Sequence, residues 1–291
     1  MRFASPFLAL ALVATPGLAQ TPKSNFPEGT TVEKDVAYGP HERNKLDVAV
    51  PKGDGPFPLL IWIHGGGWEA GDKGGFGPFA GQVARGYAVA TINYRFAKHA
   101  IFPAQIEDAK AAVRFLRTNA KKYHFDADHF GVGGLSAGGH LSALLGTSGG
   151  MKELEGDKEA KPDASRVQAV LDLFGPTDLG KLSPAVAKDN PVTRLLGGDT
   201  GTKKDLAKAG TPQTYVSKDD PPFLIIHGDA DTLVPVKQSE DLQAALTKGG
   251  VKSELIVVKG AGHGPGISSK ENSEKINAFF DASLKKASGG R

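Results

Sequence analysis

The sequence contains no cysteine among its 291 residues. Disulfide bridges and thiolate metal sites are therefore excluded. The sequence also lacks a block of like charges, because basic and acidic residues are interspersed and the formal net charge is only +3. Nucleic-acid binding usually shows as clustered basic residues, so this composition gives no indication of a nucleic-acid partner.

No apolar run approaches the roughly 20 residues that a membrane-spanning helix needs. The N-terminal run from Phe7 to Val13 follows Arg2 and precedes small residues that end at Ala19. A positive charge, a short apolar stretch and a small-residue cleavage site are typical of a secretory signal peptide. We therefore predict a signal peptide over residues 1–19, cleavage after Ala19, and a secreted or periplasmic protein.

The rest of the chain is long enough for one large domain, and no linker to a second domain interrupts it. Residues 20–30 are polar and proline-rich, which predicts an extended lead-in. We predict a single domain over residues 31–287. Near its start, residues 46–50 alternate branched apolar side chains with Asp47 and Ala49, as expected of a half-exposed antiparallel strand.

Continuous apolar runs follow, and they favour central parallel strands covered by helices on both faces. Helical periodicity lies between these runs. Residues 106–120 place apolar side chains three and four apart behind Pro103, and a second helix around 242–246 is stopped by Gly249. Strands that alternate with helices predict an α/β fold with a doubly wound, mostly parallel sheet. The apolar runs are 59–63, 87–92, 167–174, 223–226 and 255–258.

The last predicted helix buries apolar side chains between Ile276 and Leu284. Its start is expected at a capping box, which satisfies backbone N–H groups of the first turn. Ser268 with Glu271 makes a stronger pair for this purpose than Ser269 with Asn272.

Two stretches lack apolar periodicity. Residues 151–165 are highly charged, and residues 176–212 are rich in loop-forming residues. We expect both at the end of the sheet where strands deliver their functional loops, so they predict a small loop-rich cap or rim over the site. The alternative is a pair of solvated surface loops.

Residues 134–138 read G-x-S-x-G, the pattern of a nucleophile elbow in which a strand turns sharply into a helix. Such a turn crowds the positions two before and two after the serine, so only Gly134 and Gly138 fit there. Ser136 is expected to adopt strained backbone angles that expose its hydroxyl. An ordinary strand-to-helix turn is the alternative, and the surrounding motifs decide between the two.

A serine nucleophile needs hydrogen-bond donors for the oxyanion that develops during acyl transfer. Residues 64–68 read His-Gly-Gly-Gly-Trp directly after an apolar run, which matches the glycine-rich loop of such a hole. We expect the backbone N–H groups of Gly66, Gly67 and Ala137 to be the donors. A plain turn or a phosphate loop is the alternative, but no Lys-Ser or Lys-Thr follows to favour phosphate. His64 is expected to have a structural role.

The base is expected to be His263, which lies in a glycine-rich loop after the last apolar run. Most other histidines lie in polar connections, whereas His140 faces away on the helix of the serine and His227 is expected to hold the turn after its strand. The chain order Ser, acid, His supports this choice. A surface histidine is the alternative.

The acid is expected on the loop after the preceding strand, where Asp229 and Asp231 compete. We favour Asp231 because it lies further out, while Asp229 is placed to bond backbone amides of the turn. Asp178 ends another strand and is a third candidate, although a helix N-cap is the better interpretation of it. The two carboxylates at 229 and 231 lack the further oxygen ligands that a calcium loop requires.

Together these segments resemble the esterase and lipase branch of the α/β hydrolases, particularly the group that includes bacterial feruloyl and acetyl-xylan esterases. The resemblance spans residues 60–265 and implies that Ser136, Asp231 and His263 form a catalytic triad. Hormone-sensitive-lipase relatives usually have Asp before the nucleophile, whereas this chain has Leu135, which favours the feruloyl and acetyl esterase group. The segments that carry the resemblance are 64–68, 93–95, 135–141, 227–235 and 262–264.

The resemblance implies a serine carboxylesterase that acts on short acyl or aryl-acyl esters, with acetylated or feruloylated carbohydrate as the favoured substrate class. Trp68 is a candidate wall for a sugar or arene ring, and a packed core tryptophan is the alternative. An amide hydrolase of the same fold and a non-catalytic binding module are the competing functions. We expect no metal and no organic cofactor, because acyl transfer by serine needs neither. The sequence leaves the oligomeric state open.

Overall fold

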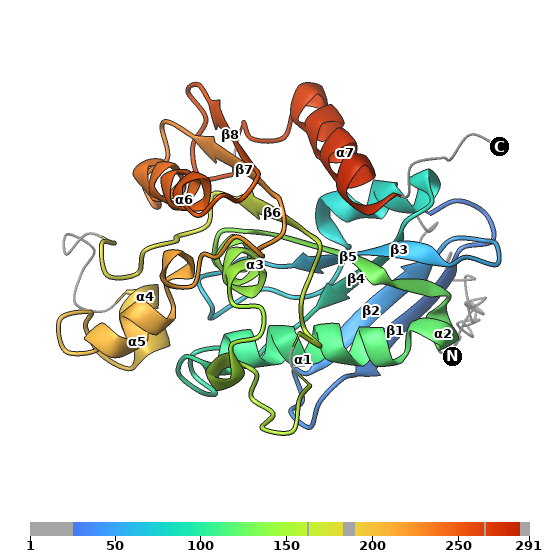
Figure 1. The fold of residues 1–291 in the computed structure, drawn as a ribbon, viewed down its shortest axis with the longest axis horizontal. Coiled ribbons are helices and arrows are strands. Elements are labelled where there is room, and N and C mark those ends of the chain that lie inside the picture. Colours follow the sequence, from blue (N-terminus) through green and yellow to red (C-terminus); the bar gives the residue numbers. More distant parts are fainter. Residues whose placement is uncertain (1–25, 162, 183–189, 265, 286–291) are drawn as a thin grey trace, which may run out of the picture.

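The computed structural model describes residues 26–161, 163–182, 190–264 and 266–285. The predicted signal peptide and its cleavage site at Ala19 lie outside these residues. One eight-stranded sheet runs through the fold in the order β1-β2-β4-β3-β5-β6-β7-β8 (Figure 1). Its strands are β1 (Thr31–Ala37), β2 (Lys45–Val50), β3 (Phe57–Ile63), β4 (Ala88–Ile92), β5 (Phe125–Leu135), β6 (Ala169–Leu173), β7 (Phe223–Gly228) and β8 (Ser253–Val258).

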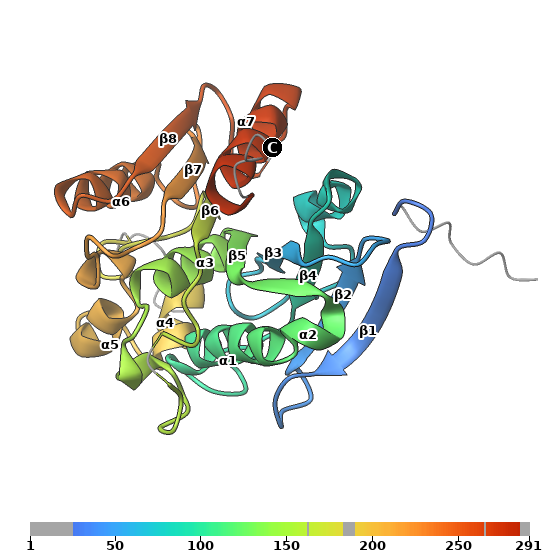
Figure 2. The same cartoon turned by 45° about the vertical axis from the view of Figure 1, so that its right-hand side comes forward.

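The sheet is mostly parallel, as predicted. β1 pairs antiparallel with β2, and β2 pairs antiparallel with β4, while the pairs from β4 through β3 and β5 to β8 are all parallel. β1 was not predicted, and it forms one edge while β8 forms the other (Figure 2). Because β8 lies at an edge, it is only partly buried, contrary to the prediction for its apolar run.

The prediction that β2 is half exposed is wrong, because both of its faces are covered. Asp47 is only 4% exposed, and its carboxylate forms an ion pair with Lys73 at 2.6 Å and accepts the N–H of Asp35 at 2.8 Å. A buried carboxylate is tolerated when it is paired and hydrogen-bonded. The alternation of polar and apolar residues in β2 therefore reflects a buried ion pair rather than solvent.

Helices cover both faces of the sheet (Figure 1). One apolar cluster joins the sheet to α1, α3 and α6, and a second joins its other face to the 3₁₀ segment η1 and to α7. This arrangement confirms the doubly wound α/β architecture. The helical elements are η1 (Gly77–Arg85), α1 (Ala104–Thr118), α2 (Ala120–Tyr123), α3 (Ala137–Thr147), η2 (Lys152–Leu154), α4 (Pro191–Leu196), α5 (Lys204–Ala209), η3 (Pro212–Thr214), α6 (Lys237–Lys248) and α7 (Lys270–Leu284).

The predicted helices at 106–120 and 242–246 correspond to α1 and α6, and α6 ends at Gly249 as expected. The N-terminus of α7 differs from the prediction by one residue. Ser269 is the N-cap, and its side chain accepts the N–H of Asn272 at 3.0 Å, so the preference for Ser268 with Glu271 was wrong.

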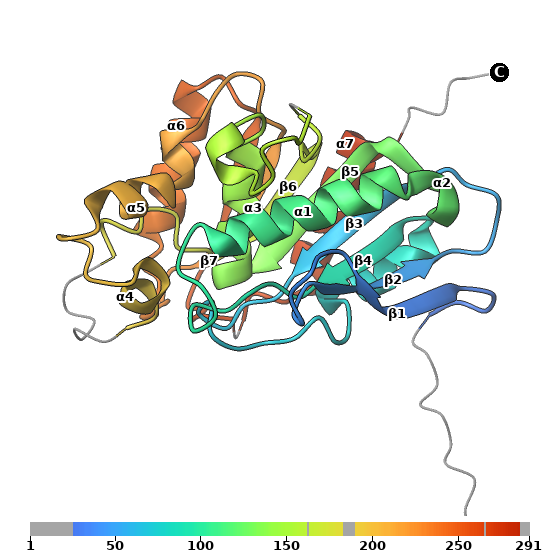
Figure 3. The same ribbon diagram turned by 90° about the horizontal axis from the view of Figure 1, so that it is seen from below.

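The two irregular stretches lie in different parts of the fold. Residues 151–165 join the end of α3 to the start of β6, so they lie at the opposite end of the strands from the functional loops, and their predicted place over the site is wrong. Residues 176–212 follow the carboxyl end of β6 and contain α4 and α5, which lie together at one end of the molecule (Figure 3). Helix α4 of this second stretch forms the rim described below.

Candidate active site

Ser136 lies at the sharp turn between β5 and α3. Its backbone angles, φ 53° and ψ −120°, are sparsely populated for a residue with a side chain. The flanking glycines are required by close contacts: a Cβ on Gly134 would lie 2.3 Å from the carbonyl oxygen of Gly138, and one on Gly138 would lie 2.1 Å from that of Ile63. The local geometry is that expected for a nucleophile elbow.

The structure brings Ser136, His263 and Asp231 together from three separate loops. The Nε2 atom of His263 lies 2.9 Å from Ser136 Oγ, and its Nδ1 atom lies 2.7 Å from Asp231 Oδ2. If Nδ1–H donates to the carboxylate, Nε2 is left free to accept the serine hydroxyl proton. The three side chains thus form one hydrogen-bonded chain that can activate a serine oxygen.

Asp231 is held as an acceptor by its own loop after β7. Its Oδ1 atom accepts the backbone N–H groups of Leu233 at 2.8 Å and Val234 at 2.9 Å, while Oδ2 faces His263. The residue is 8% exposed. These bonds fix the orientation of the carboxylate before any substrate binds.

The two competing carboxylates lie elsewhere. Asp229 accepts the backbone N–H of Gly260 at 2.6 Å, which is the turn-bonding role expected from the sequence. Asp178 accepts the N–H of Lys181 at 3.1 Å and pairs with its ammonium group at 3.0 Å. Asp178 caps a turn rather than a helix, so its predicted role as a helix N-cap is wrong.

The glycine-rich loop after β3 packs directly against the elbow. A Cβ on Gly65 would lie 2.5 Å from the side chain of Leu135 and 3.4 Å from the Cβ of Ser136. Gly66 and Gly67 have φ angles of 103° and 60°, which glycine adopts readily. Among the described residues, no backbone carbonyl oxygen accepts the N–H of either glycine. Ala137 is the first residue of α3, so its N–H has no intrahelical acceptor.

His64 has the structural role expected of it. Its Nδ1 atom lies 2.7 Å from the carbonyl oxygen of Gly65, and its ring stacks on Tyr94 with centroids 4.6 Å apart. Burial lowers its pKa, so the ring is neutral at neutral pH. His64 therefore holds the start of the glycine-rich loop through its contact with Gly65.

Trp68 is only 2% exposed. Its indole N–H donates to Nδ1 of His140 at 3.3 Å, and Nε2 of that histidine lies 2.6 Å from the carbonyl oxygen of Gly210. Burial lowers the pKa of His140 to about 4. The position of Trp68 favours the packed core alternative over a wall for a sugar ring.

The sequence did not indicate which residues border the glycine-rich loop. Pro191, the first residue of α4, lies 3.2 Å from the position that a Cβ on Gly67 would occupy. Arg194 of the same helix pairs with Glu69, with 2.7 Å between Nη2 and Oε2. Helix α4 thus forms a rim beside the expected oxyanion donors. The one feature of the sequence that could have indicated this helix is Asn190 followed by Pro191, which is typical of a helix start.

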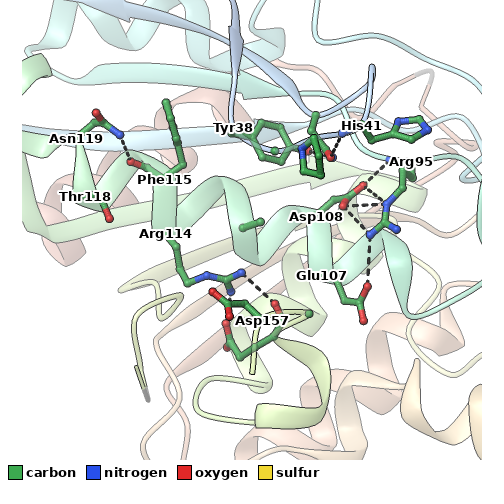
Figure 4. Close-up of a pocket in the computed structure, with 16 residues that line it drawn as sticks. Tyr38, His41, Arg95, Glu107, Asp108, Arg114, Phe115, Thr118, Asn119 and Asp157 are labelled. Atoms are coloured by element: carbon green, nitrogen blue, oxygen red, sulfur yellow. Dashed lines mark hydrogen bonds and ion pairs between the residues drawn. The ribbon is translucent and has the colours of Figure 1, made fainter. Parts of the chain in front are cut away.

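A groove of about 860 Å³ lies along α1 (Figure 4). Several of its charged side chains pair with one another: Arg95 pairs with Asp108 at 2.8 Å, and Arg114 bonds Glu155. None of the three residues of the hydrogen-bonded chain lines it. Within the described residues, no group of three or more metal-ligating side chains is found, and no helix is both long and apolar enough to cross a membrane.

Comparison with known proteins finds esterases among the relatives of this chain. Esterase LipC of Mycobacterium tuberculosis is 31% identical over 79% of this chain and 59% of its own length. The chain spans about half to three fifths of the length of the first curated relatives that it matches.

Solved structures show the same fold. A truncated carbohydrate esterase from gut microbiota is 35% identical, with a TM-score of 0.82 over 91% of this chain and 99% of that one. An acetyl ester-xyloside bifunctional hydrolase from Caldicellulosiruptor lactoaceticus is 27% identical, with a TM-score of 0.68 over 82% of this chain and 88% of that one. A family model described as BD-FAE matches residues 46–246, which is more than half of the chain. The chain therefore belongs to the BD-FAE family of α/β hydrolases.

Proposed function

We propose that this protein is a serine carboxylesterase that forms an acyl-enzyme on Ser136. The observation that carries the proposal is the continuous hydrogen-bonded chain from Ser136 Oγ through His263 to Asp231. A serine hydroxyl is a weak nucleophile at neutral pH, and a base within hydrogen-bond distance overcomes this weakness.

In the first step, His263 Nε2 accepts the hydroxyl proton of Ser136 as Oγ bonds to the ester carbonyl carbon. Asp231 stabilises the imidazolium that forms, and it keeps Nε2 as the nitrogen that faces the serine. The imidazolium then donates the proton to the alcohol oxygen as the carbon–oxygen bond breaks. Water repeats the sequence on the acyl-enzyme and releases the carboxylic acid.

We assign the N–H groups of Gly66, Gly67 and Ala137 as the donors that stabilise the negative charge developing on the carbonyl oxygen. The first two belong to the loop packed on the elbow, and the third opens α3, where the helix dipole adds positive potential. Donors fixed before the reaction stabilise the transition state without reorganising.

For the substrate, we propose short acyl or aryl-acyl esters, with acetylated or feruloylated carbohydrate as the favoured class. The carbohydrate esterase named above, which this chain covers almost completely, supports this choice. The sequence of residues 1–19 supports export, so the enzyme would meet such esters outside the cytoplasm. An amide substrate is the second candidate, because the same triad and oxyanion donors serve amide hydrolysis.

The mechanism is tested with a fluorophosphonate probe and with Ser136→Ala. The wild type is expected to be labelled at Ser136, and the variant is expected to fold normally, to escape labelling and to lose several orders of magnitude in kcat. Near-normal turnover by Ser136→Ala would overturn the mechanism. Absence of both labelling and turnover in the wild type would favour a binding module.

The substrate class is tested by comparing kcat/KM for acetyl, butyryl, feruloyl and long-chain esters and for the matching amides, since this ratio reports differential transition-state binding. We expect the short and feruloyl esters to be preferred. A steady rise in kcat/KM beyond acyl chains of about ten carbons would instead indicate a long apolar acyl channel.

A further inference from the structure

Phe174 immediately follows β6 and has an unusual backbone conformation. Its φ angle is 44°, in the left-handed region that residues with a side chain rarely adopt. The residue is 4% exposed. Strain of this kind persists only where the surroundings hold it in place.

Hydrogen bonds on both sides hold this conformation. The N–H of Phe174 donates to the carbonyl oxygen of Ile226 on β7 at 2.9 Å. The next N–H, that of Gly175, donates to Oδ1 of the buried Asp172 at 2.9 Å. The preceding residue is tied to the nucleophile, because the N–H of Ser136 donates to the carbonyl oxygen of Leu173 at 2.9 Å.

The same turn is clamped against the first turn of α3. A Cβ on Gly139 would lie 2.4 Å from Asp172 Oδ1, and a Cβ on Gly175 would lie 2.5 Å from that oxygen and 2.5 Å from the backbone nitrogen of His140. These contacts leave no room for the turn to shift relative to the serine helix. The backbone of Phe174 is thus held in a fixed position relative to that of Ser136.

The ring of Phe174 lies against the expected base. Its centroid is 4.8 Å from that of His263, with an interplanar angle of 69°, and 6.4 Å from that of His227. On the same loop as the base, the Cβ position of Gly264 lies 4.0 Å from Phe174 Cζ. The ring therefore contacts the imidazole that must exchange a proton with Ser136.

We propose that Phe174 is a positioning residue, whose strained backbone presses its ring against His263 and fixes the angle of the imidazole relative to Ser136 Oγ. This inference rests on the proposed role of His263 as base. Its two hydrogen bonds, from Nδ1 to Asp231 and between Nε2 and Ser136 Oγ, leave the ring free to tilt about the line that joins the two nitrogens. The aromatic wall removes this freedom, and proton transfer is sensitive to small errors in position.

The test compares Phe174→Gly with the wild type. Glycine adopts a φ of 44° without strain, so this variant removes the ring while retaining the turn. We expect kcat for a short soluble ester to fall about tenfold to a hundredfold with KM changed less than about twofold, because the base is misplaced and the substrate contacts are kept. Phe174→Leu restores apolar bulk beside His263 and is expected to recover part of the lost kcat.

Phe115→Ala is the matched control, because this partly buried phenylalanine of α1 lines the groove described above and, among the described residues, has no hydrogen bond, ion pair or ring contact with Ser136, Asp231 or His263. We expect it to lower the unfolding temperature while kcat stays at the wild-type value. A wild-type kcat in folded Phe174→Gly would overturn the inference, and so would a rise in KM with kcat unchanged. If Phe174→Gly does not fold, a wild-type kcat in Phe174→Leu would overturn it. Failure of the underlying mechanism is recognised separately, as a wild-type enzyme that hydrolyses esters without labelling at Ser136.

Discussion

The Nε2 atom of His227 lies 3.2 Å from Asp231 Oδ2, the same carboxylate oxygen that faces His263. Nε2 also lies 2.8 Å from the carbonyl oxygen of Val234, so this nitrogen carries the hydrogen. Burial lowers the pKa of His227, and its Nδ1 atom lies 2.7 Å from the hydroxyl of Ser239. The neutral His227 therefore places its Nε2–H against both the carboxylate of the proposed acid and the carbonyl oxygen of Val234 in the same loop.

We predict that His227→Gln lowers kcat/KM about tenfold to a hundredfold, because a hydrogen bond to a charged group contributes about 1.5–3 kcal/mol. The free energy of unfolding should fall as well, since the turn to Val234 loses a bond. Steady-state kinetics and urea unfolding measure the two effects. His129→Gln, on β5, is the control and should leave kcat/KM unchanged. Unchanged turnover in His227→Gln would show that Asp231 needs no such support.

We predict a ranking of the loss of kcat when each of the three candidate carboxylates is replaced by an amide. Asp231→Asn should lower kcat by about four orders of magnitude, because an amide at this position favours the wrong tautomer of the base. Asp229→Asn and Asp178→Asn should cost less than about tenfold, since their carboxylates bond backbone amides of turns. The measurement is kcat for each folded variant. If Asp178→Asn is the most damaging of the three, the assignment of the acid is wrong.

The sheet and the elbow were predictable because each has a local cause. A continuous apolar run predicts a strand that is buried on both faces. The glycines at 134 and 138 are required by close contacts that every such turn makes. The positions of the proposed triad residues were predictable for a related reason: each follows the carboxyl end of a parallel strand, and those ends meet at one edge of the sheet.

What the sequence did not indicate depends on partners distant along the chain. Asp47 looked solvent-exposed because Lys73, its ion-pair partner, belongs to a separate loop. The place of residues 151–165 depended on the direction of α3, which returns the chain to the far end of the strands. The contact of Phe174 with His263 joins two loops that no local pattern connects.

A stability prediction follows from the glycines of the elbow. Gly138→Ala should unfold or severely destabilise the protein, because its Cβ would lie 2.1 Å from the backbone oxygen of Ile63, which cannot move without breaking the pairing of β3. Gly81→Ala is the matched control: nothing lies within 4 Å of its Cβ position, and it lies in the 3₁₀ segment η1. We expect this control to change the free energy of unfolding by less than about 1 kcal/mol. Equal stability of the two variants in urea unfolding would contradict the packing described for the elbow.

The last prediction concerns Asp172, beneath the turn that carries Phe174. Complete burial raises the pKa of its carboxyl to about 7, against an ordinary value of 3.8, and the N–H of Gly175 offsets only part of this effect. The folded state therefore holds the proton more tightly than the unfolded state. The stabilisation is complete below the unfolded pKa and is lost as the pH rises through the folded pKa.

Asp172→Asn cannot titrate, so it isolates this contribution while keeping an oxygen that can accept the N–H of Gly175. Between about pH 5 and about pH 8, the wild type should lose about 2 to 3 kcal/mol of unfolding free energy relative to the variant, since each pKa unit corresponds to about 1.4 kcal/mol. Urea unfolding of both proteins at the two pH values measures the difference. A constant difference in the free energy of unfolding between the two proteins across this range would show that the carboxyl is charged throughout it. The surroundings of Asp172 between α3 and the end of β6 would then stabilise the charge better than its burial implies.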